Sequence, residues 1–203
     1  MLIKTLPVGQ LETNCYVVTD EDSLDCAVID PGDESGTILD YLEDNKLHCR
    51  AVLLTHAHFD HVGAANALLE ATGARLYMCE KELELVKGGA SGRFTVPEDV
   101  KYYRDGDTVE VGGLRFEVME TPGHTPGGVT LRCGEALFTG DTLFRGSCGR
   151  TDFAGGDMRQ ELRSLKRIAE LPGDYEVYPG HAESSMLSIE REHNPYVRHA
   201  LEK

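Results

Sequence analysis

Histidine and aspartate side chains are concentrated in the segment His56-Ala57-His58-Phe59-Asp60-His61, which holds three of the eight histidines of the chain. In an extended segment, side chains two residues apart project to the same side, so His56 and His58 could bind one cation together. Asp60 and His61 are adjacent and should diverge, which suits a second cation beside the first. Imidazole and carboxylate groups are common ligands of divalent metals. The spacing therefore predicts a site for two metal ions.

Three further metal-capable residues, His124, Asp141 and His181, each follow a predicted strand, as the segment 56–61 follows the apolar run 51–54. Strand ends are rigid points from which side chains far apart in sequence can be aimed into one site. We therefore expect these residues to join the segment 56–61. The remaining histidines lack this context and are expected on the surface: His48, His193 and His199.

Apolar and β-branched runs separated by turn residues predict two strand-rich halves, each followed by helices. This pattern favours two packed sheets with helices outside. The predicted strands cover residues 2–6, 15–19, 26–29, 51–54, 75–78, 108–111, 114–120, 129–133, 136–139 and 175–178. The predicted helices cover residues 37–45, 62–71, 81–87, 158–169 and 184–192.

The composition is that of an ordinary globular protein, with 203 residues, 40% hydrophobic and 27% charged, and predicts one domain over residues 1–203. A formal net charge of -15 disfavours nucleic acid and anionic membranes as partners and leaves a small-molecule substrate. The six cysteines form no Cys-x-x-Cys pair, and no secretory signal or membrane-length apolar run is visible. We expect a reduced, cytoplasmic protein, monomeric or dimeric.

Four strings resemble the metallo-β-lactamase superfamily and, within it, the glyoxalase II-like branch. They are Thr-His-Ala-His-Phe-Asp-His at 55–61, Thr-Pro-Gly-His-Thr-Pro-Gly at 121–127, Gly-Asp-Thr-Leu-Phe at 140–144 and Tyr-Pro-Gly-His at 178–181. The resemblance extends through nearly the whole chain, including Asn14-Cys15-Tyr16 and the segment 28–32. It implies an α/β fold, a four-layer αββα sandwich of the metallo-β-lactamase type, with a dinuclear site at the edges of the sheets.

The resemblance also implies a role for each ligand residue. The first metal would be held by His56, His58 and His124, the second by Asp60, His61 and His181, and both by Asp141. Asp30, at another strand end, resembles the acid that orients a ligand in this family without binding metal. Two divalent ions are expected, zinc by default, although the same ligands accept iron, manganese or cobalt.

The activity that the branch implies is hydrolysis of a thioester of the S-2-hydroxyacylglutathione type by attack of a metal-bound hydroxide. Asp60 would orient the nucleophile and assist proton transfer, and Asp141 would bridge the metals. Arg150 aligns with a basic residue of the family's substrate pocket and could meet a substrate carboxylate or form a structural salt bridge. Cys148, in the same loop, is expected to serve packing.

The substrate stays open, because the chain ends 22 residues after His181 (203 - 181) and leaves no room for the helical C-terminal domain of full-length glyoxalase II. Persulfide dioxygenases resemble the same motifs and would bind a single iron through His56, His124 and Asp141. Lactonase or β-lactamase activity is compatible with the same fold. A non-catalytic zinc-binding protein is a further alternative, although structural zinc sites usually close with four ligands.

Overall fold

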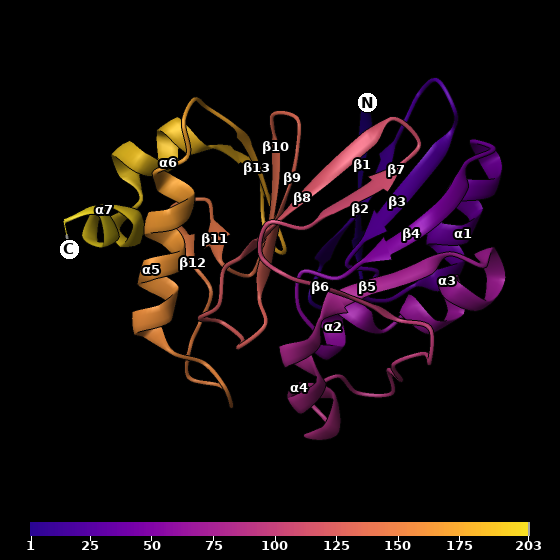
Figure 1. Ribbon diagram of the computed structural model, residues 1–203, viewed down its shortest axis with the longest axis horizontal. Helices are drawn as coiled ribbons and strands as arrows, with labels where there is room; N and C mark the ends of the chain where they lie inside the picture. Colours follow the sequence, from indigo (N-terminus) through magenta and orange to yellow (C-terminus); the bar gives the residue numbers. More distant parts are fainter. Residues whose placement is uncertain (203) are drawn as a thin grey trace.

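A computed structural model describes residues 1–202 and has four layers, with two six-stranded sheets facing each other and helices on both outer faces (Figure 1). In the first sheet the strand order follows the chain: β1 (Leu2–Val8), β2 (Thr13–Thr19), β3 (Asp25–Ile29), β4 (His48–Leu53), β5 (Arg75–Cys79) and β6 (Lys101–Tyr103). The pairs β1·β2 and β2·β3 are antiparallel, and the later pairs are parallel. The predicted αββα sandwich is confirmed.

The second sheet is built from strands of the C-terminal half of the chain. Its order is β14 (Ser185–Met186), β13 (Glu176–Pro179), β10 (Ala136–Gly140), β9 (Val129–Cys133), β8 (Leu114–Glu120) and β7 (Thr108–Val111). A small ribbon pairs β11 (Leu143–Phe144) with β12 (Ser147–Cys148). It lies between the second sheet and the helices on its outer side.

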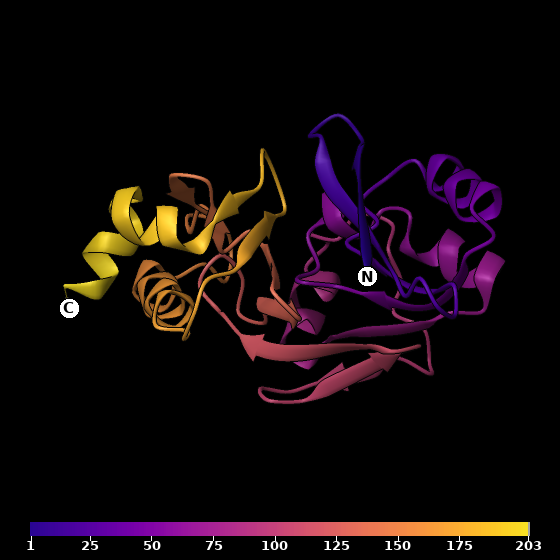
Figure 2. The same ribbon diagram turned by 90° about the horizontal axis from the view of Figure 1, so that it is seen from above.

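The helices form two groups at opposite ends of the molecule (Figure 2). Beside the first sheet lie α1 (Ser35–Asp44), α2 (Phe59–Val62), α3 (Ala65–Thr72), the 3-10 turn η1 (Glu80–Glu82) and α4 (Leu83–Lys87). Beside the second sheet lie α5 (Met158–Ala169), α6 (Leu187–His193) and α7 (Pro195–Leu201). Within residues 1–202, none of these helices has the length and apolar character needed to cross a lipid bilayer.

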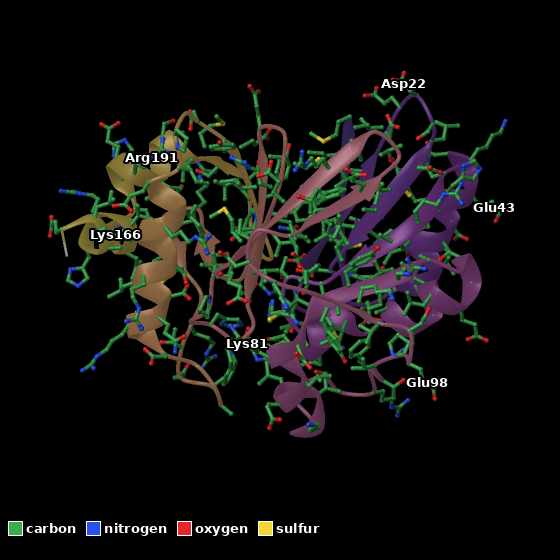
Figure 3. The ribbon with its side chains drawn as sticks, viewed as in Figure 1. Asp22, Glu43, Lys81, Glu98, Lys166 and Arg191 are labelled. Carbon is green, nitrogen blue, oxygen red and sulfur yellow. The ribbon has the colours of Figure 1, made fainter. Side chains whose placement is uncertain are left out.

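Strand β2 explains why the first sheet forms an inner layer. Successive side chains of a strand point to opposite faces, so Cys15 and Val17 pack with the helices while Tyr16 and Val18 pack against the second sheet. Burial on both faces stabilises this strand by about 1.5 to 3 kcal/mol for each large apolar side chain. Charged side chains such as Asp22, Glu43 and Lys166 project outward from the layers (Figure 3).

The predicted helix at 62–71 differs from the structure. Helix α2 begins at Phe59, and a separate helix α3 begins at Ala65. Between them the backbone N–H of Ala64 donates at 2.9 Å to the carbonyl oxygen of Pro31, a residue outside the helix, so the helical hydrogen bonding is interrupted. Asp60 and His61 therefore lie within a helical turn and not on the preceding loop.

Several short elements were not predicted, namely β6, β11, β12, β14 and α7. Most are strands of two or three residues, too short for an apolar pattern to appear. Helix α7 did have a signal, because the side chain of Asn194 caps its first turn and Pro195 occupies the first helical position.

Candidate metal centre

The side chains expected to bind metal converge at one edge of the two facing sheets. His56 and His58 follow β4, and Asp60 and His61 belong to α2, all beside the first sheet. From the second sheet, His124 follows β8, Asp141 follows β10 and His181 follows β13. The three histidines predicted to be superficial, His48, His193 and His199, are exposed.

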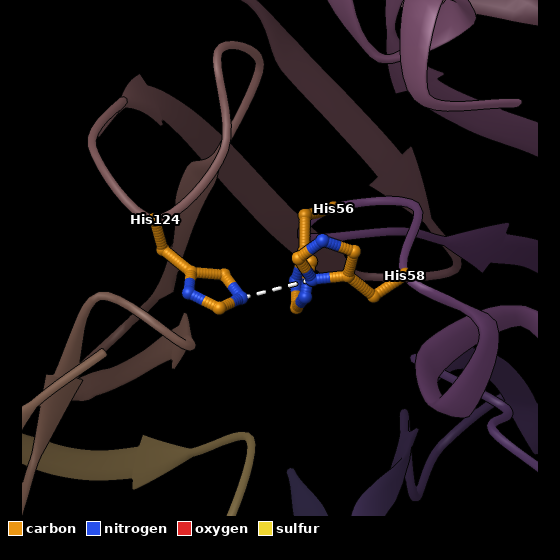
Figure 4. Close-up of side chains that lie close together, drawn as sticks. All are labelled: His56, His58 and His124. Carbon is orange, nitrogen blue, oxygen red and sulfur yellow. Dashed lines mark hydrogen bonds between the residues drawn. The ribbon is translucent and has the colours of Figure 1, made fainter. Parts of the chain in front are cut away.

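His56, His58 and His124 form the first set of side chains able to hold a cation. One ring nitrogen of each lies within 4.8 Å of one in both others. Nδ1 of His58 is 2.9 Å from Nε2 of His124, the contact drawn in Figure 4. The extended backbone of His58, with φ -68° and ψ 150°, lets its side chain turn to the same side as that of His56.

Asp60, His61 and His181 form the second set, again with one ligand atom of each within 4.8 Å of the others. Oδ2 of Asp60 is 3.2 Å from Nε2 of His181 and 3.6 Å from Nε2 of His61. The sequence predicted that Asp60 and His61 would diverge, and that was wrong. Neighbouring side chains of a helical turn are about 100° apart, so both can face the site.

Asp141 lies between the two sets. Its Oδ1 is 3.4 Å from Nε2 of His61, and its Oδ2 is 3.5 Å from Nε2 of His124 and 3.6 Å from Nε2 of His181. The same carboxylate therefore reaches one histidine of the first set and two of the second. This is the position that a bridging ligand requires.

Hydrogen bonds outside the site orient the histidines. Nδ1 of His124 donates to the carbonyl oxygen of Arg150 at 2.7 Å, and Nδ1 of His181 donates to that of Leu11 at 3.1 Å. Each bond leaves Nε2 unprotonated and directed at the site, since a neutral imidazole carries one N–H.

Asp30 orients His61 in the same way, with its Oδ2 2.9 Å from Nδ1 of that ring. The Thr55 backbone N–H donates to Oδ1 of Asp30 at 2.7 Å, and the Thr55 hydroxyl donates to Oδ2 at 2.5 Å. Asp30 has a left-handed backbone, φ 50°, which aspartate tolerates better than most residues. Asp30 also lies within 4.8 Å of ligand atoms of His56 and His61, but its oxygens are already engaged by Thr55 and His61.

Three buried atoms at the centre lack a hydrogen-bond partner among residues 1–202: Nε2 of His56, Nε2 of His61 and Oδ1 of Asp141. A buried polar atom without a partner is costly and rare in folded proteins. All three are lone-pair donors of the kinds that divalent cations accept. The residues present therefore fit a metal centre.

The ionisation states of the first set suit metal binding. Burial lowers the pKa of His56 well below its ordinary value and that of His58 to about 4, and the neighbouring histidines lower both further. Burial acts to raise the pKa of Asp141, but His61 and His124 outweigh it and the pKa is lowered. Neutral imidazoles beside an ionised carboxylate are the forms that bind cations. In the second set burial is outweighed by the neighbouring carboxylates, which raise the pKa of His61 and His181, so these rings must lose a proton when a cation binds.

Gly180 is required by close packing at the centre. A side chain at this position would place its Cβ 2.2 Å from Oδ1 of Asp141 and 2.7 Å from Cε1 of His61. Only glycine lets the strand end that carries His181 approach this closely. Glycine before His181 is therefore part of the geometry of the site.

Two buried glutamates that no sequence motif singled out contact the ligand loops. Glu82 accepts hydrogen bonds from the backbone N–H groups of Ala57 and Gly127, both at 2.7 Å. Glu161 accepts one from the N–H of His124 at 2.9 Å. Burial raises the pKa of Glu161 to about 9, so its carboxyl is uncharged at neutral pH.

A cavity of about 770 Å³ opens onto the centre. Its apolar walls include Leu11, Phe59, Phe144 and Phe153. Five of the candidate ligands also line it: His58, Asp60, His124, Asp141 and His181. A second cavity of about 470 Å³ lies on the other side of Phe59 and shares Leu11, Phe59 and Asp60 with the first. Together they provide room on both sides of Asp60.

Arg150 lines the larger cavity but is already paired. Its Nε and one terminal nitrogen each lie 2.7 Å from an oxygen of Asp152, and its guanidinium carbon is 4.0 Å from the centre of the Phe153 ring. The structural salt bridge that we expected as one of two possible roles of Arg150 is therefore present. Because 58% of the Arg150 side chain is exposed, solvent screens this pair and a substrate carboxylate could share the guanidinium.

Cys148 also lines this cavity and packs against the helices of the second sheet. Burial raises the pKa of its thiol to about 12, which keeps the group protonated and unreactive. All six cysteines are free thiols, in agreement with the prediction of no disulfide framework.

The chain belongs to the metallo-beta-lactamase superfamily, whose family model matches residues 8–181. It is 32% identical to hydroxyacylglutathione hydrolase GloC of Haemophilus influenzae, over 97% of this chain and 98% of that protein. Among solved structures, TTHA1623 in a di-iron-bound form is 36% identical, with a TM-score of 0.85 over 95% of this chain and 99% of that one. ETHE1 from Myxococcus xanthus is 33% identical, with a TM-score of 0.83 over 96% and 84%.

The match to this family places the protein in a class of metal-binding proteins. Members of this superfamily are mostly hydrolases and bind divalent metals. The matched residues 8–181 include each expected metal ligand from His56 to His181.

Proposed function

We propose that this protein is a dinuclear metal hydrolase that cleaves thioesters of the S-2-hydroxyacylglutathione type, with zinc as the expected metal. The observation that carries the proposal is the position of Asp141 within 3.6 Å of histidines from both sets. A single carboxylate between two complete sets of three ligands is the arrangement of a two-metal site. The likeness to GloC supports the substrate class.

Each candidate ligand has a proposed role. The first ion would be held by His56, His58 and His124, the second by Asp60, His61 and His181, and Asp141 would contact both. When bound, two divalent ions supply a water of lowered pKa and polarise the carbonyl under attack. Zinc, iron and manganese all accept imidazole and carboxylate ligands, and the di-iron form of TTHA1623 keeps iron among the candidates.

Asp60 would orient the attacking water and assist the transfer of its proton. The Thr13 hydroxyl donates to Oδ2 of Asp60 at 3.2 Å and so limits rotation of the carboxylate. Burial acts to raise the pKa of Asp60, but the neighbouring His181 and His61 outweigh it and the pKa is lowered. A carboxylate held in this way is ionised at neutral pH and ready to accept a hydrogen bond from water.

The cavities suit a substrate with two halves. A thioester carbonyl placed beside Asp60 would extend its acyl group and its thiol carrier into the two spaces that meet there. Leu11, Phe59, Phe144 and Phe153 would exclude water from the reacting carbon. Arg150 would meet a carboxylate of the substrate at the rim of the larger cavity.

The persulfide dioxygenase alternative uses a single iron at His56, His124 and Asp141. It gives no ligand role to Asp60, His61 and His181, although these three lie within 4.8 Å of one another. This unused second set favours the two-metal hydrolase.

The test combines metal analysis with substrate assays on the purified protein. We expect two metal ions per chain, rapid hydrolysis of an S-2-hydroxyacylglutathione, and slower hydrolysis of lactones and β-lactams. One iron per chain with oxygen consumption on glutathione persulfide would overturn the proposal in favour of the dioxygenase. Loaded protein that hydrolyses none of these compounds would favour a non-catalytic role.

A further inference from the structure

The peptide unit between the two neighbouring ligands His56 and His58 is held on both sides by buried side chains. The N–H of Ala57 donates to Oε2 of Glu82 at 2.7 Å, and its carbonyl oxygen accepts a hydrogen bond from the hydroxyl of Ser91. Glu82 is 1% exposed and Ser91 is 2% exposed. A buried carboxylate is costly unless its oxygens are satisfied, so this arrangement is specific.

The second oxygen of Glu82 reaches the other sheet. Oε1 accepts a hydrogen bond at 2.7 Å from the N–H of Gly127, in the loop that carries His124. A side chain at position 127 would place its Cβ 2.7 Å from this oxygen, so glycine alone permits the contact. One carboxylate therefore joins the loop of His56 and His58 to the loop of His124.

We propose that Glu82, assisted by Ser91, is a positioning residue that sets the distance between the two loops holding the first metal. It does not face the second set, whose members Asp60, His61 and His181 are oriented by Thr13, Asp30 and Leu11. Loss of this connection should weaken retention of the first ion selectively. The inference rests on the proposed two-metal centre.

The two buried glutamates offer a matched pair of substitutions. Glu82 uses both oxygens as acceptors, so in Glu82→Gln the amide NH2 must face a backbone N–H and one of the two contacts breaks. Glu161 uses only Oε2, and its Oε1 has no partner among residues 1–202. Glu161→Gln can keep its single hydrogen bond with the amide oxygen.

We expect Glu82→Gln to retain the first ion about 10 to 100 times less tightly than the wild type, the range typical of partners that orient ligands. Glu161→Gln should retain it within about threefold. The readout is the number of metal ions per chain after dialysis against graded chelator concentrations. Equal retention in Glu82→Gln and the wild type, or equal losses in both variants, would overturn the inference.

Two reference variants identify the ion that is lost. In a His181→Ala background, which keeps the first set, Glu82→Gln should lower metal retention further, whereas in a His58→Ala background it should change nothing. Similar losses in both backgrounds would indicate a general structural role and contradict selective positioning. If Glu82→Gln does not fold, Ser91→Ala tests the same peptide, and unchanged retention of the first ion in that variant would overturn the inference.

The experiment distinguishes failure of this inference from failure of the proposed function. A wild-type protein with a single ion would contradict the two-metal proposal. The inference about Glu82 depends only on whether retention of the first ion falls when the carboxylate is replaced.

Discussion

Asp30 and His61 are joined inside the protein by a 2.9 Å contact between Oδ2 and Nδ1, with 2% and 0% of their side chains exposed. The contact fixes which nitrogen of His61 faces the metal centre. Through the ring that it orients, Asp30 would act on an ion held by the second set.

Asp30→Asn should therefore weaken binding of the second ion. Asparagine tolerates the left-handed backbone at this position, but its amide group cannot satisfy Thr55 and His61 together. We expect a loss of about 10 to 100-fold in metal affinity or hydrolysis. Elemental analysis and steady-state kinetics measure it, with Asp40→Asn at an exposed position of α1 as the control. Wild-type values for Asp30→Asn would exclude this role.

Gly180→Ala should disable the centre without unfolding the protein. The added methyl group would occupy space 2.2 Å from Oδ1 of Asp141. We expect hydrolysis to fall by at least about a hundredfold, because a small misplacement of reacting groups has effects of this size. Gly36→Ala, where no atom lies within 4 Å of the added carbon, provides the control. Circular dichroism confirms folding, and full activity of Gly180→Ala would contradict the geometry.

Arg150→Gln should raise the KM of a thioester that carries a carboxylate and leave kcat nearly unchanged. We expect an increase of about tenfold, equivalent to about 1.4 kcal/mol of binding energy. A neutral thioester should show no change. Arg145→Gln is the matched control, since Arg145 is equally exposed at 58% and is paired with Glu183 outside the larger cavity. Equal effects on both substrates would remove Arg150 from substrate recognition.

The thiol of Cys148 provides a prediction of pH dependence. Because burial raises its pKa to about 12, the neutral form persists and the reactive thiolate increases only as the pH approaches that value. At pH 8 we expect alkylation of Cys148 by iodoacetamide to be about a thousandfold slower than that of a free cysteine with a pKa of about 8.5. Peptide mass spectrometry follows the reaction. A rate that levels off below pH 9 would identify an activated cysteine instead.

The convergence of the candidate ligands could be predicted from sequence because each stands in a short string near the end of an apolar strand. His56 and His58 are two residues apart, and local backbone geometry alone brings them together. The order of β1 to β3 was predictable for a similar reason, since neighbouring antiparallel strands follow one another along the chain.

Other features depend on contacts between distant segments. Glu82 belongs to a short polar turn, and nothing in its neighbourhood indicates that its carboxylate reaches Gly127, 45 residues further along the chain. The break between α2 and α3 was missed because the N–H of Ala64 bonds to the carbonyl oxygen of Pro31, a contact between separate segments. The pairing of Arg150 with Asp152 was considered but could not be decided without the conformation of the loop.

The number of metal ions per chain, measured by elemental analysis in the wild type, His58→Ala and His181→Ala, tests the two-metal centre most directly. With Asp141 between two sets of ligands, we expect two ions in the wild type and one in each variant. One ion in the wild type, together with an unchanged count in His181→Ala, would contradict the dinuclear hydrolase.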